Sequence, residues 1–577
     1  MNKIRSRLVR DLKSKIVKNT FLKISCLFFS LFVSIIFPCH SCPAADLNDL
    51  YQQLVKKNAF LYEGELSYFD MREEGIHGHV NYENFDSQPH IYSFDNLLTF
   101  SPLECLELAL GFNQAFFGKY KRSTYSAAGT LAVVQRYDLE YFRDYILHLR
   151  LRYEPAEFYL DILEKNQKDN WKAEPYPAAL DYFTYMRSHY EDFKTGIRYL
   201  RASSGGEEES NLSKLKRPLL DHTQLNIEAE LGYKKGVLRR NVYYYSGGLT
   251  FLNFYHQLTG QLIPKLNLRY GLSKDLEMES GLSYITPFKY KFEYKTATAI
   301  AKSLLQGTYR LDNSIQFPLR LRYRPKSNLE VMFSSDFSFA DQKLYYWYVD
   351  TTGTVTTYPT KKLSYYNTQP TLVVSYLYDD NKKIAQSEFS RLTKELLLKG
   401  QCLMELKYQK DITALDKNST NGPQNIIDPY NVFMYPVDYF VAGSEYAAFF
   451  TGNTSSSATN VLPQNYYIYQ LNFKYGLTDK LNAGFGVGYH SSSHLHHFTL
   501  GNPVAGSYDL KSRFYKFKPY YFFDTIWDWR VTQNSIISFS SHFVPEYTSL
   551  LTIEGQPQEY KAKDSYFTLT LGVKFLF

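Results

Sequence analysis

The last eleven residues of the chain alternate between apolar and polar or small side chains, and this pattern constrains the fold more than any other feature. Successive side chains of a β-strand point to opposite faces, so one face of this segment suits lipid and the other suits a polar interior. About 9–11 tilted residues are enough for a strand to cross the hydrocarbon of a bilayer. Leu576 is the one apolar residue on the polar face. The segment is therefore predicted to be a membrane-spanning strand with these residues toward lipid: Phe567, Leu569, Leu571, Val573, Phe575 and Phe577.

The end of this strand resembles the C-terminal strand of outer-membrane β-barrels of diderm bacteria. Those barrels commonly finish in Phe, with apolar residues at alternate positions before it. The residues that match here are Leu569, Leu571, Val573, Phe575 and Phe577. The resemblance implies that these residues form the assembly signal that the barrel-assembly machinery reads. It also implies that the protein lies in the cell outer membrane, in contact with outer-membrane lipid. It indicates the class of protein and not the solute.

The same period of two recurs along residues 59–577, where short turns separate the alternating segments. Bacterial single-chain barrels have even numbers of strands. We therefore expect an all-β fold, a transmembrane antiparallel up-and-down β-barrel of about 16–20 strands, with 18 the expected number. The chain has 53 Tyr and 42 Phe against 4 Trp, and tyrosines gather at the two water interfaces of a membrane. A large soluble β-protein could also be rich in tyrosine, but the recurring alternation and the terminal strand favour the barrel.

A secretory signal peptide is predicted over residues 1–44. Basic residues precede the apolar run 24–37, and the small residues that follow suit cleavage after Ala44 or Ala45. The run is shorter than the roughly 20 residues that a transmembrane helix needs. A signal anchor and a lipoprotein anchor are the alternatives.

Residues 45–58 are predicted to form a short helix that lies in the periplasm or in the barrel mouth. Leucines and a tyrosine recur there at helical spacing behind a possible Asp46 cap. The alternative is an ordinary N-terminal helix that only packs. A TonB-dependent receptor would need a plug domain before its strands, and only this short stretch precedes the first strand, which disfavours that class.

The charge and cysteine content limit which partners and which disulfide the protein is expected to have. The chain has 65 Lys and Arg against 58 Asp and Glu. Residues 1–44 contain eight of the basic residues and one of the acidic ones, so residues 45–577 contain 57 of each. A nucleic-acid partner would need a surplus of basic residues on one face, so none is expected. Cys105 and Cys402 could pair in an oxidising envelope or stay free, because alternation puts them on different kinds of face.

Two close sequence copies, at residues 266–277 and 471–482, carry the turns of the expected barrel. Each has an aromatic residue, a glycine and a short polar stretch before a new alternating strand. The aromatic side chain anchors the strand end at the interface, and the glycine makes the tight reversal. The first copy is similar to turns in the barrel family linked to meta-pathway phenol degradation and in other outer-membrane transporters.

Longer connections are expected at the opposite end of the barrel from these turns. The longest, residues 411–464, carries aromatic stretches, so part of it is expected to fold inward or to pack on the rim. The expected connections are residues 117–138, 166–190, 341–368, 411–464, 491–512 and 548–564.

Charged residues alternate with apolar ones on several predicted strands, which directs them toward the interior. Residues 139–153 and 314–324 carry basic ladders, and other strands carry acids. One interpretation is a charged lumen that guides a polar solute past basic and acidic walls. The other is a salt-bridge network that fills a closed lumen. The lumen-lining candidates are His148, Arg150, Arg152, Glu228, Glu230, Glu277, Glu279, Arg320, Arg322, Arg324 and Glu330.

No catalytic residue, metal site or cofactor is predicted. The cluster His490, His494, His496 and His497 has no acid nearer downstream than Asp509, and a metal site would need converging ligands with acidic or Cys support. The inward glycines at 484, 486 and 488 either relieve crowding or make room for a loop or ligand. No Gly-x-Ser-x-Gly elbow, His-Glu-x-x-His motif or phosphate-binding glycine loop appears, so an enzyme is not expected.

These patterns predict an outer-membrane channel or transporter that passes a small or oligomeric solute, such as a small molecule or an oligosaccharide, through a charged lumen. The alternative is a structural or surface-assembly barrel, associated with envelope-polymer export, whose lumen is occluded and whose long loops bind the partner.

Overall fold

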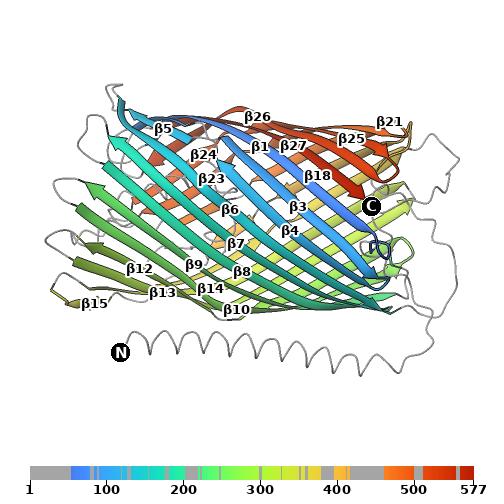
Figure 1. The fold of residues 1–577 in the computed structure, drawn as a ribbon, viewed down its shortest axis with the longest axis horizontal. Coiled ribbons are helices and arrows are strands. Elements are labelled where there is room, and N and C mark those ends of the chain that lie inside the picture. Colours follow the sequence, from blue (N-terminus) through green and yellow to red (C-terminus); the bar gives the residue numbers. More distant parts are fainter. Residues whose placement is uncertain are drawn as a thin grey trace.

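The computed structural model is a closed antiparallel β-barrel, which confirms the predicted all-β fold (Figure 1). Over the described residues its wall has 18 strands, the expected number. Several wall strands are interrupted, so that one sheet of 27 strand segments makes up the wall. No helix in the described part is long and apolar enough to span a bilayer. The structure describes residues 54–577 without 78–82, 88–89, 118–119, 126–130, 154, 176–180, 202–218, 221–223, 246–248, 287, 298–301, 327, 350–351, 358–360, 379–395, 411, 416–459, 465, 500–510 and 554–558.

Neighbouring wall strands follow one another in chain order, and the last strand pairs with the first. β27 (Glu559–Leu576) runs antiparallel to β1 (Phe60–His77), with Leu61 opposite Leu576 and Gly75 opposite Ala562. This pairing closes the wall. The next segments are β2 (Glu83–Ser87), β3 (His90–Leu103), β4 (Leu106–Phe117), β5 (Tyr120–Tyr125), β6 (Leu131–Tyr153), β7 (Ala156–Pro175), β8 (Asp181–Arg201), β9 (Leu225–Tyr245), β10 (Leu249–Ser273), β11 (Leu276–Ile285), β12 (Phe288–Ala297) and β13 (Lys302–Lys326).

The second half of the wall contains most of the interrupted strands. Two successive segments then share one place in the wall, as β21 and β20 do beside β22 and β23. The segments are β14 (Leu329–Val349), β15 (Val355–Thr357), β16 (Lys361–Thr368), β17 (Thr371–Tyr378), β18 (Cys402–Lys410), β19 (Ile412–Leu415), β20 (Asn460–Gln464), β21 (Tyr467–Thr478), β22 (Leu481–His490), β23 (Ser493–Thr499), β24 (Lys511–Phe517), β25 (Tyr520–Thr532) and β26 (Ser535–Ile553).

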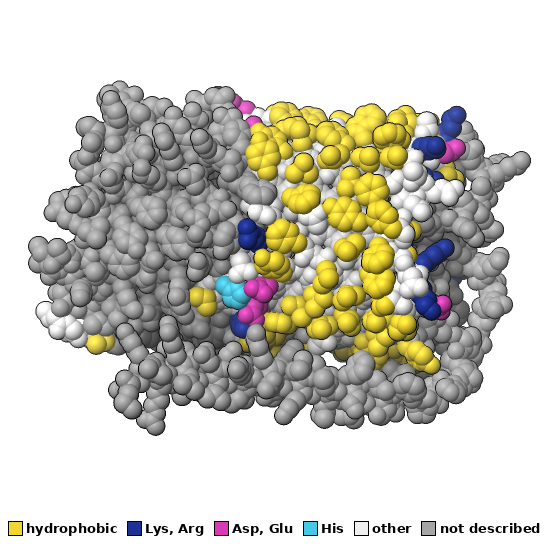
Figure 2. All heavy atoms as spheres, viewed as in Figure 1, with side chains coloured by type: hydrophobic (Ala, Val, Ile, Leu, Met, Phe, Trp, Pro, Cys, Tyr) yellow, Lys and Arg dark blue, Asp and Glu magenta, His cyan; other side chains and the backbone are white. Residues whose placement is uncertain are grey.

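Apolar side chains cover the outside of the wall in a band bordered by charged side chains, as Figure 2 shows. Leu66, Leu110 and Leu282 are 49%, 55% and 50% exposed there. In water this much exposed apolar surface would be unfavourable, whereas in a bilayer it contacts lipid of matching polarity. Because side chains alternate, the polar residues between these positions point to the inner face.

The two sequence copies form equivalent hairpins, as predicted. β10 and β11 meet with a register shift between Gly271 and Ser273, and β21 and β22 meet with a matching shift between Gly476 and Thr478. A shift of this kind is a bulge that tightens the reversal.

The predicted long connections were wrong in their extent, because strands fill much of them. β7 continues to Pro175 and β8 begins at Asp181, inside the predicted connection 166–190. Strand pairing there continues beyond the apolar band, where the outer face no longer needs apolar residues and the period of two no longer marks the strand. Residues 416–459, in the longest predicted connection, lie outside the described residues.

The last residue of the chain lies beside the start of β1, at the end of the barrel that carries the short hairpins (Figure 1). The Phe577 N–H donates to the Phe60 carbonyl at 2.8 Å, and the Phe60 N–H donates to the Phe577 carbonyl at 3.1 Å. Most of the predicted helix 45–58 lies outside the described residues, and residues 54–58 are not helical. Asn58, with φ 61°, turns the chain into β1.

Candidate functional site

The two arginine-bearing strands present their charges on the inner face. Tyr145 and Tyr153 of β6 are 45% and 57% exposed on the outer face, and the positions of Arg150 and Arg152 alternate with them. On β13, Tyr323 is exposed while its neighbours Arg322 and Arg324 are buried. Three of the predicted acidic residues pair with the arginines of β13, namely Glu277 and Glu279 of β11 and Glu330 of β14. The other two, Glu228 and Glu230 of β9, instead contact residues of β7 and β8 that the sequence did not single out.

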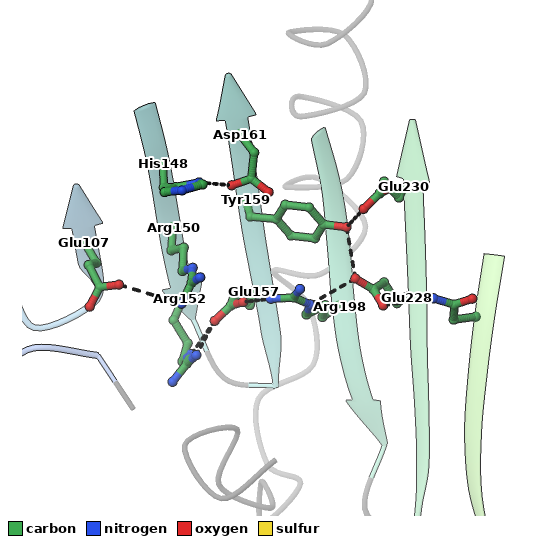
Figure 3. Close-up of polar contacts among 11 residues, drawn as sticks. Glu107, His148, Arg150, Arg152, Glu157, Tyr159, Asp161, Arg198, Glu228 and Glu230 are labelled. Atoms are coloured by element: carbon green, nitrogen blue, oxygen red, sulfur yellow. Dashed lines mark hydrogen bonds and ion pairs between the residues drawn. The ribbon is translucent and has the colours of Figure 1, made fainter. Parts of the chain in front are cut away.

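Glu157 of β7 is the hub of the first group of contacts (Figure 3). The Arg152 Nε donates to Glu157 Oε2 at 2.7 Å, and the Arg198 Nη1 donates to Glu157 Oε1 at 2.6 Å. Arg198 of β8 also reaches Glu228 of β9, from Nε to Oε1 at 3.1 Å. The Glu157 side chain is completely buried. A buried carboxylate is stable only where cations and hydrogen bonds replace its water, and the two arginines meet that need.

Tyr159 joins this group to two more carboxylates. Its Oη lies 3.0 Å from Glu228 Oε1 and 2.8 Å from Glu230 Oε2, so its single proton serves two acceptors. The Arg198 guanidinium stacks 4.4 Å from the centre of the Tyr159 ring. Gly196 makes the position of this ring possible, because an added Cβ would lie 2.4 Å from Tyr159 Cζ.

A second group of contacts continues the pattern on the next strands. Arg269 Nε of β10 pairs with Glu277 Oε1 of β11 at 2.6 Å, and Arg322 Nη1 of β13 lies 3.5 Å from the same oxygen. Arg322 and Arg324 both reach Glu330 of β14, with Nη2 and Nε at 3.0 and 3.2 Å from Oε2. Acid and base therefore alternate from strand to strand.

We name these residues the charged belt. Arg320 pairs with Glu279 at 3.5 Å, and Arg150 lies 3.8 Å from Glu107. Each guanidinium faces a carboxylate, and the seven of each sign cancel, so the belt as a whole has no net charge. Its members are Arg150, Arg152, Arg198, Arg269, Arg320, Arg322, Arg324, Glu107, Glu157, Glu228, Glu230, Glu277, Glu279 and Glu330.

His148, the remaining predicted residue, pairs outside the belt. Its Nδ1 lies 2.8 Å from Asp161 Oδ1 of β7, on the inner face beside Arg150 (Figure 3). Both side chains are about one-third exposed, at 33% and 32%.

Several residues of these contacts were not among the sequence predictions. They are the belt residues Glu107, Glu157, Arg198 and Arg269, and Tyr159, which joins them. The alternation contains a signal for each, since Arg269 lies between the exposed Leu268 and Tyr270. A single charged residue on a strand is a weaker sequence signal than a ladder of charged residues, and sequence alone does not show which charges become neighbours.

Three chain segments lie in the short-hairpin end of the barrel and contact belt residues or one another. The Val55 N–H donates to Glu107 Oε2 at 2.9 Å, and the Leu220 N–H donates to Glu277 Oε2 at 2.8 Å. Both carboxylates are almost fully buried. Leu396 packs with Val55 in an apolar cluster that includes Leu61 and Ile536. These contacts tie the described residues of the three segments to this end of the barrel.

The described residues contain no group of His, Cys, Asp and Glu that could hold a metal ion. Cys105 and Cys402 are free thiols in the structure. His490 stacks against Tyr520 with ring centroids 4.8 Å apart. The side chains of His494, His496 and His497, and Asp509, lie outside the described set.

Comparisons with known proteins give no close relative. No protein-family model matches the chain, and no curated protein matches it. The toluene transporter TodX of P. putida is 9% identical over 90% of each chain, with a TM-score of 0.34. The ferric yersiniabactin uptake receptor FyuA from Yersinia pestis is 10% identical over 91% of this chain and 81% of that one, with a TM-score of 0.42. The siderophore receptor PiuA from Acinetobacter baumannii is 9% identical over 91% and 82%, with a TM-score of 0.40. At these values no family or substrate is transferred to this chain.

Proposed function

We propose that this protein is an outer-membrane channel or transporter that passes a small or oligomeric solute through its charged lumen. The observation that carries the proposal is a closed 18-strand wall with an apolar outer band and a polar, charged inner face. Apolar outside and polar inside is the arrangement of a barrel in lipid. Barrels of about 16–18 strands usually enclose an aqueous channel.

Conductance of the purified protein in a planar bilayer tests this proposal. The expected result is a steady open channel whose unit current scales with salt concentration. A protein that inserts fully folded but never conducts would contradict the proposal. Heat-modifiable migration on a gel and β-type circular dichroism would establish in the same sample that the barrel is folded.

The alternative is an occluded structural or surface-assembly barrel, and the segments in the mouth favour it. Val55 and Leu220 contact buried belt carboxylates with their backbone N–H groups, which ties both segments to the inner wall. Replacing Val55 and Leu220 by Pro removes both N–H donors and leaves the wall carboxylates with their arginines. If the wild type is silent and the double variant conducts, the mouth segments are a plug and the occluded reading holds. If both conduct equally, these segments do not block passage.

Delivery to the outer membrane follows from the proposed leader, residues 1–44. N-terminal sequencing of the protein isolated from the outer-membrane fraction is expected to begin at Ala45 or Asp46. A mature protein that retains the basic leader in the inner membrane would instead support a signal anchor.

A further inference from the structure

Four aromatic rings stack in a row on the inner face, in a part of the wall that the charged belt does not reach. Ring centroids are 4.7 Å apart from Tyr466 to His490, 4.8 Å from His490 to Tyr520, and 4.5 Å from Tyr520 to Tyr547. We name these four residues the ring row. Tyr521, the chain neighbour of Tyr520, is 56% exposed on the outer face, which fixes Tyr520 on the inner one.

The orientation of the rings decides what they offer a solute. The centroid spacing equals the distance of about 4.8 Å between neighbouring strands, so the rings stand upright from the wall and cover one another's faces. Stacking leaves the ring edges, which carry the phenol hydroxyls, as the parts that a solute can reach, while His490 Nδ1 lies 2.7 Å from the Ser491 carbonyl oxygen. The ring row is therefore rigid and presents hydrogen-bonding groups more than apolar faces.

A group of polar side chains lies beside the ring row. The Gln470 Nε2 donates to Asp524 Oδ2 at 3.0 Å and to Asn472 Oδ1 at 3.1 Å. His542 lies between Asp524 and Tyr566, with Nδ1 2.6 Å from Asp524 Oδ1 and Nε2 3.3 Å from Tyr566 Oη. We name these five residues the polar cluster. Carboxylate, amides, imidazole and phenol supply both donors and acceptors at one place.

The inward glycines of β22 bring the polar cluster together. Gln470 of β21 reaches Asp524 of β25 across β22, which is possible because Gly486 and Gly488 have no side chains. An added Cβ at Gly486 would lie 2.5 Å from Asn472 Oδ1, and one at Gly488 would lie 1.9 Å from Phe522 Cζ. The glycines therefore admit neighbouring side chains and do not leave an empty recess.

Exposure distinguishes the polar cluster from the most buried part of the charged belt. The side chains of Asp524 and His542 retain 30% and 34% exposure, whereas those of Glu157 and Arg152 retain 0% and 4%. The buried belt groups bind one another and have little contact with water. The polar cluster can exchange its water contacts for contacts with a solute.

We propose that the ring row and the polar cluster form a binding site for a neutral oligosaccharide inside the barrel, an inference that rests on the proposed channel function. A sugar carries hydroxyls that pair with carboxylate, amide and phenol groups, and its C–H faces pack on the faces of the tilted rings of Phe522 and Tyr566 beside His542. An apolar aromatic solute would leave these hydrogen-bonding groups without partners. A charged solute would need a net field, and the belt provides none.

The test uses the full-length mature protein in detergent and in a planar bilayer, with maltohexaose and cellohexaose as probes. Isothermal titration is expected to show binding of at least one of them. Tyr520→Phe removes a hydroxyl, and Asp524→Asn replaces one accepting carboxylate oxygen by a donating amide group; both keep the shape, and each is expected to weaken binding about fivefold. Tyr521→Phe removes a hydroxyl from the outer face of the same strand and is the matched control, with unchanged binding.

The two measurements separate this inference from the proposed function. If the channel conducts, the sugar is expected to block its current at the concentrations at which titration shows binding. If it conducts but neither sugar binds, or toluene binds in their place, the inference is overturned and the channel function stands. If the barrel is silent yet binds a hexaose that Tyr520→Phe weakens, the site stands and the channel function fails. Equal effects of Tyr520→Phe and Tyr521→Phe on affinity would also overturn the site.

Discussion

At the scale of single residues, burial distinguishes the charged side chains that stabilise the wall from those that contribute little to its stability. Glu157 is fully buried and accepts hydrogen bonds from Arg152 and Arg198 on both neighbouring strands. Glu546 pairs with Lys563 at a similar distance of 2.7 Å, but these side chains are 59% and 56% exposed. Both carboxylates lie at hydrogen-bond distance from a cation, but Glu157 is shielded from water and Glu546 is not.

Glu157→Gln is expected to lower the free energy of unfolding by about 3 to 5 kcal/mol, because two buried guanidinium groups lose their shared carboxylate. Urea unfolding in lipid vesicles, followed by tryptophan fluorescence, measures the change. Glu546→Gln is the matched control and is expected to stay within about 1 kcal/mol of the wild type. Equal losses for the two variants would show that Glu157 is not a structural hub.

Gly196→Ala tests the packing of Tyr159 over a glycine. The added Cβ would lie 2.4 Å from the Tyr159 ring, so the ring must move and give up its contacts with Glu228 and Glu230. Overpacking of this kind costs about 1 to 3 kcal/mol. At Gly572, also in a strand, the nearest atom to an added Cβ is 3.6 Å away, so Gly572→Ala is expected to change stability by less than about 0.5 kcal/mol. The same vesicle unfolding assay compares the two.

At the scale of the strand, the terminal strand β27 contains residues that stabilise the folded wall and a last side chain that contacts it little. Its inner face takes part in the wall, since Thr570 Oγ1 lies 2.9 Å from Ser67 Oγ and the Lys574 Nζ lies 3.2 Å from Glu63 Oε1. The last side chain, Phe577, is 73% exposed, and its main chain makes the pairing with Phe60. The ring therefore adds little to the folded state, so the expected role of Phe577 in assembly can be tested separately from its effect on stability.

Phe577→Ala is expected to reduce the amount of folded protein in the outer membrane several-fold while the stability of the purified barrel changes by less than about 0.5 kcal/mol. The heat-modifiable band from outer-membrane fractions measures yield, and vesicle unfolding measures stability. Phe539→Ala on β26 removes another outer-face ring, 41% exposed, and is expected to leave the yield near normal. A parallel loss of yield and stability in Phe577→Ala would assign the ring to the fold.

At the scale of the whole molecule, the inner wall is polar all round but chemically uneven. The charged belt runs from β4 to β14, and the ring row with the polar cluster spans β21 to β27. Each arginine of the belt lies within 4 Å of a belt carboxylate, so the fields of these pairs cancel at short distance. Such a lumen is expected to discriminate weakly between small cations and anions.

Reversal potentials in a KCl gradient are expected to be near zero for the wild type. Arg150→Gln removes a belt cation that is 24% exposed and leaves Glu107 without it, so the K⁺ to Cl⁻ permeability ratio is expected to rise about fivefold. Lys563→Gln removes a cation near the start of β27, outside the charged belt, and is expected to leave the K⁺ to Cl⁻ permeability ratio unchanged. A strong ion preference in the wild type would contradict the neutrality of the belt.

Sequence patterning predicted the class of fold and the faces of its strands because both depend on local periodicity. A period of two assigns each side chain to lipid or to lumen without knowledge of any neighbour. It therefore directed Arg150, Arg322 and Glu277 toward the lumen, and the apolar face of the terminal strand toward lipid. It failed beyond the apolar band, as in residues 166–190, where lipid no longer imposes the pattern.

The sequence by itself determined that this chain builds an all-β barrel with an apolar outside and a polar inside. Only the tertiary structure decided which charges meet, since contacts such as Arg198 with Glu157 and Glu228 join three strands whose relative register is set by turns and closure. The tertiary structure also brought Leu220 to Glu277 and gathered Gln470, Asp524 and His542 from three strands. Faces follow from the chemistry of each residue and its neighbours in the chain, whereas sites follow from strand register, which is not a local property.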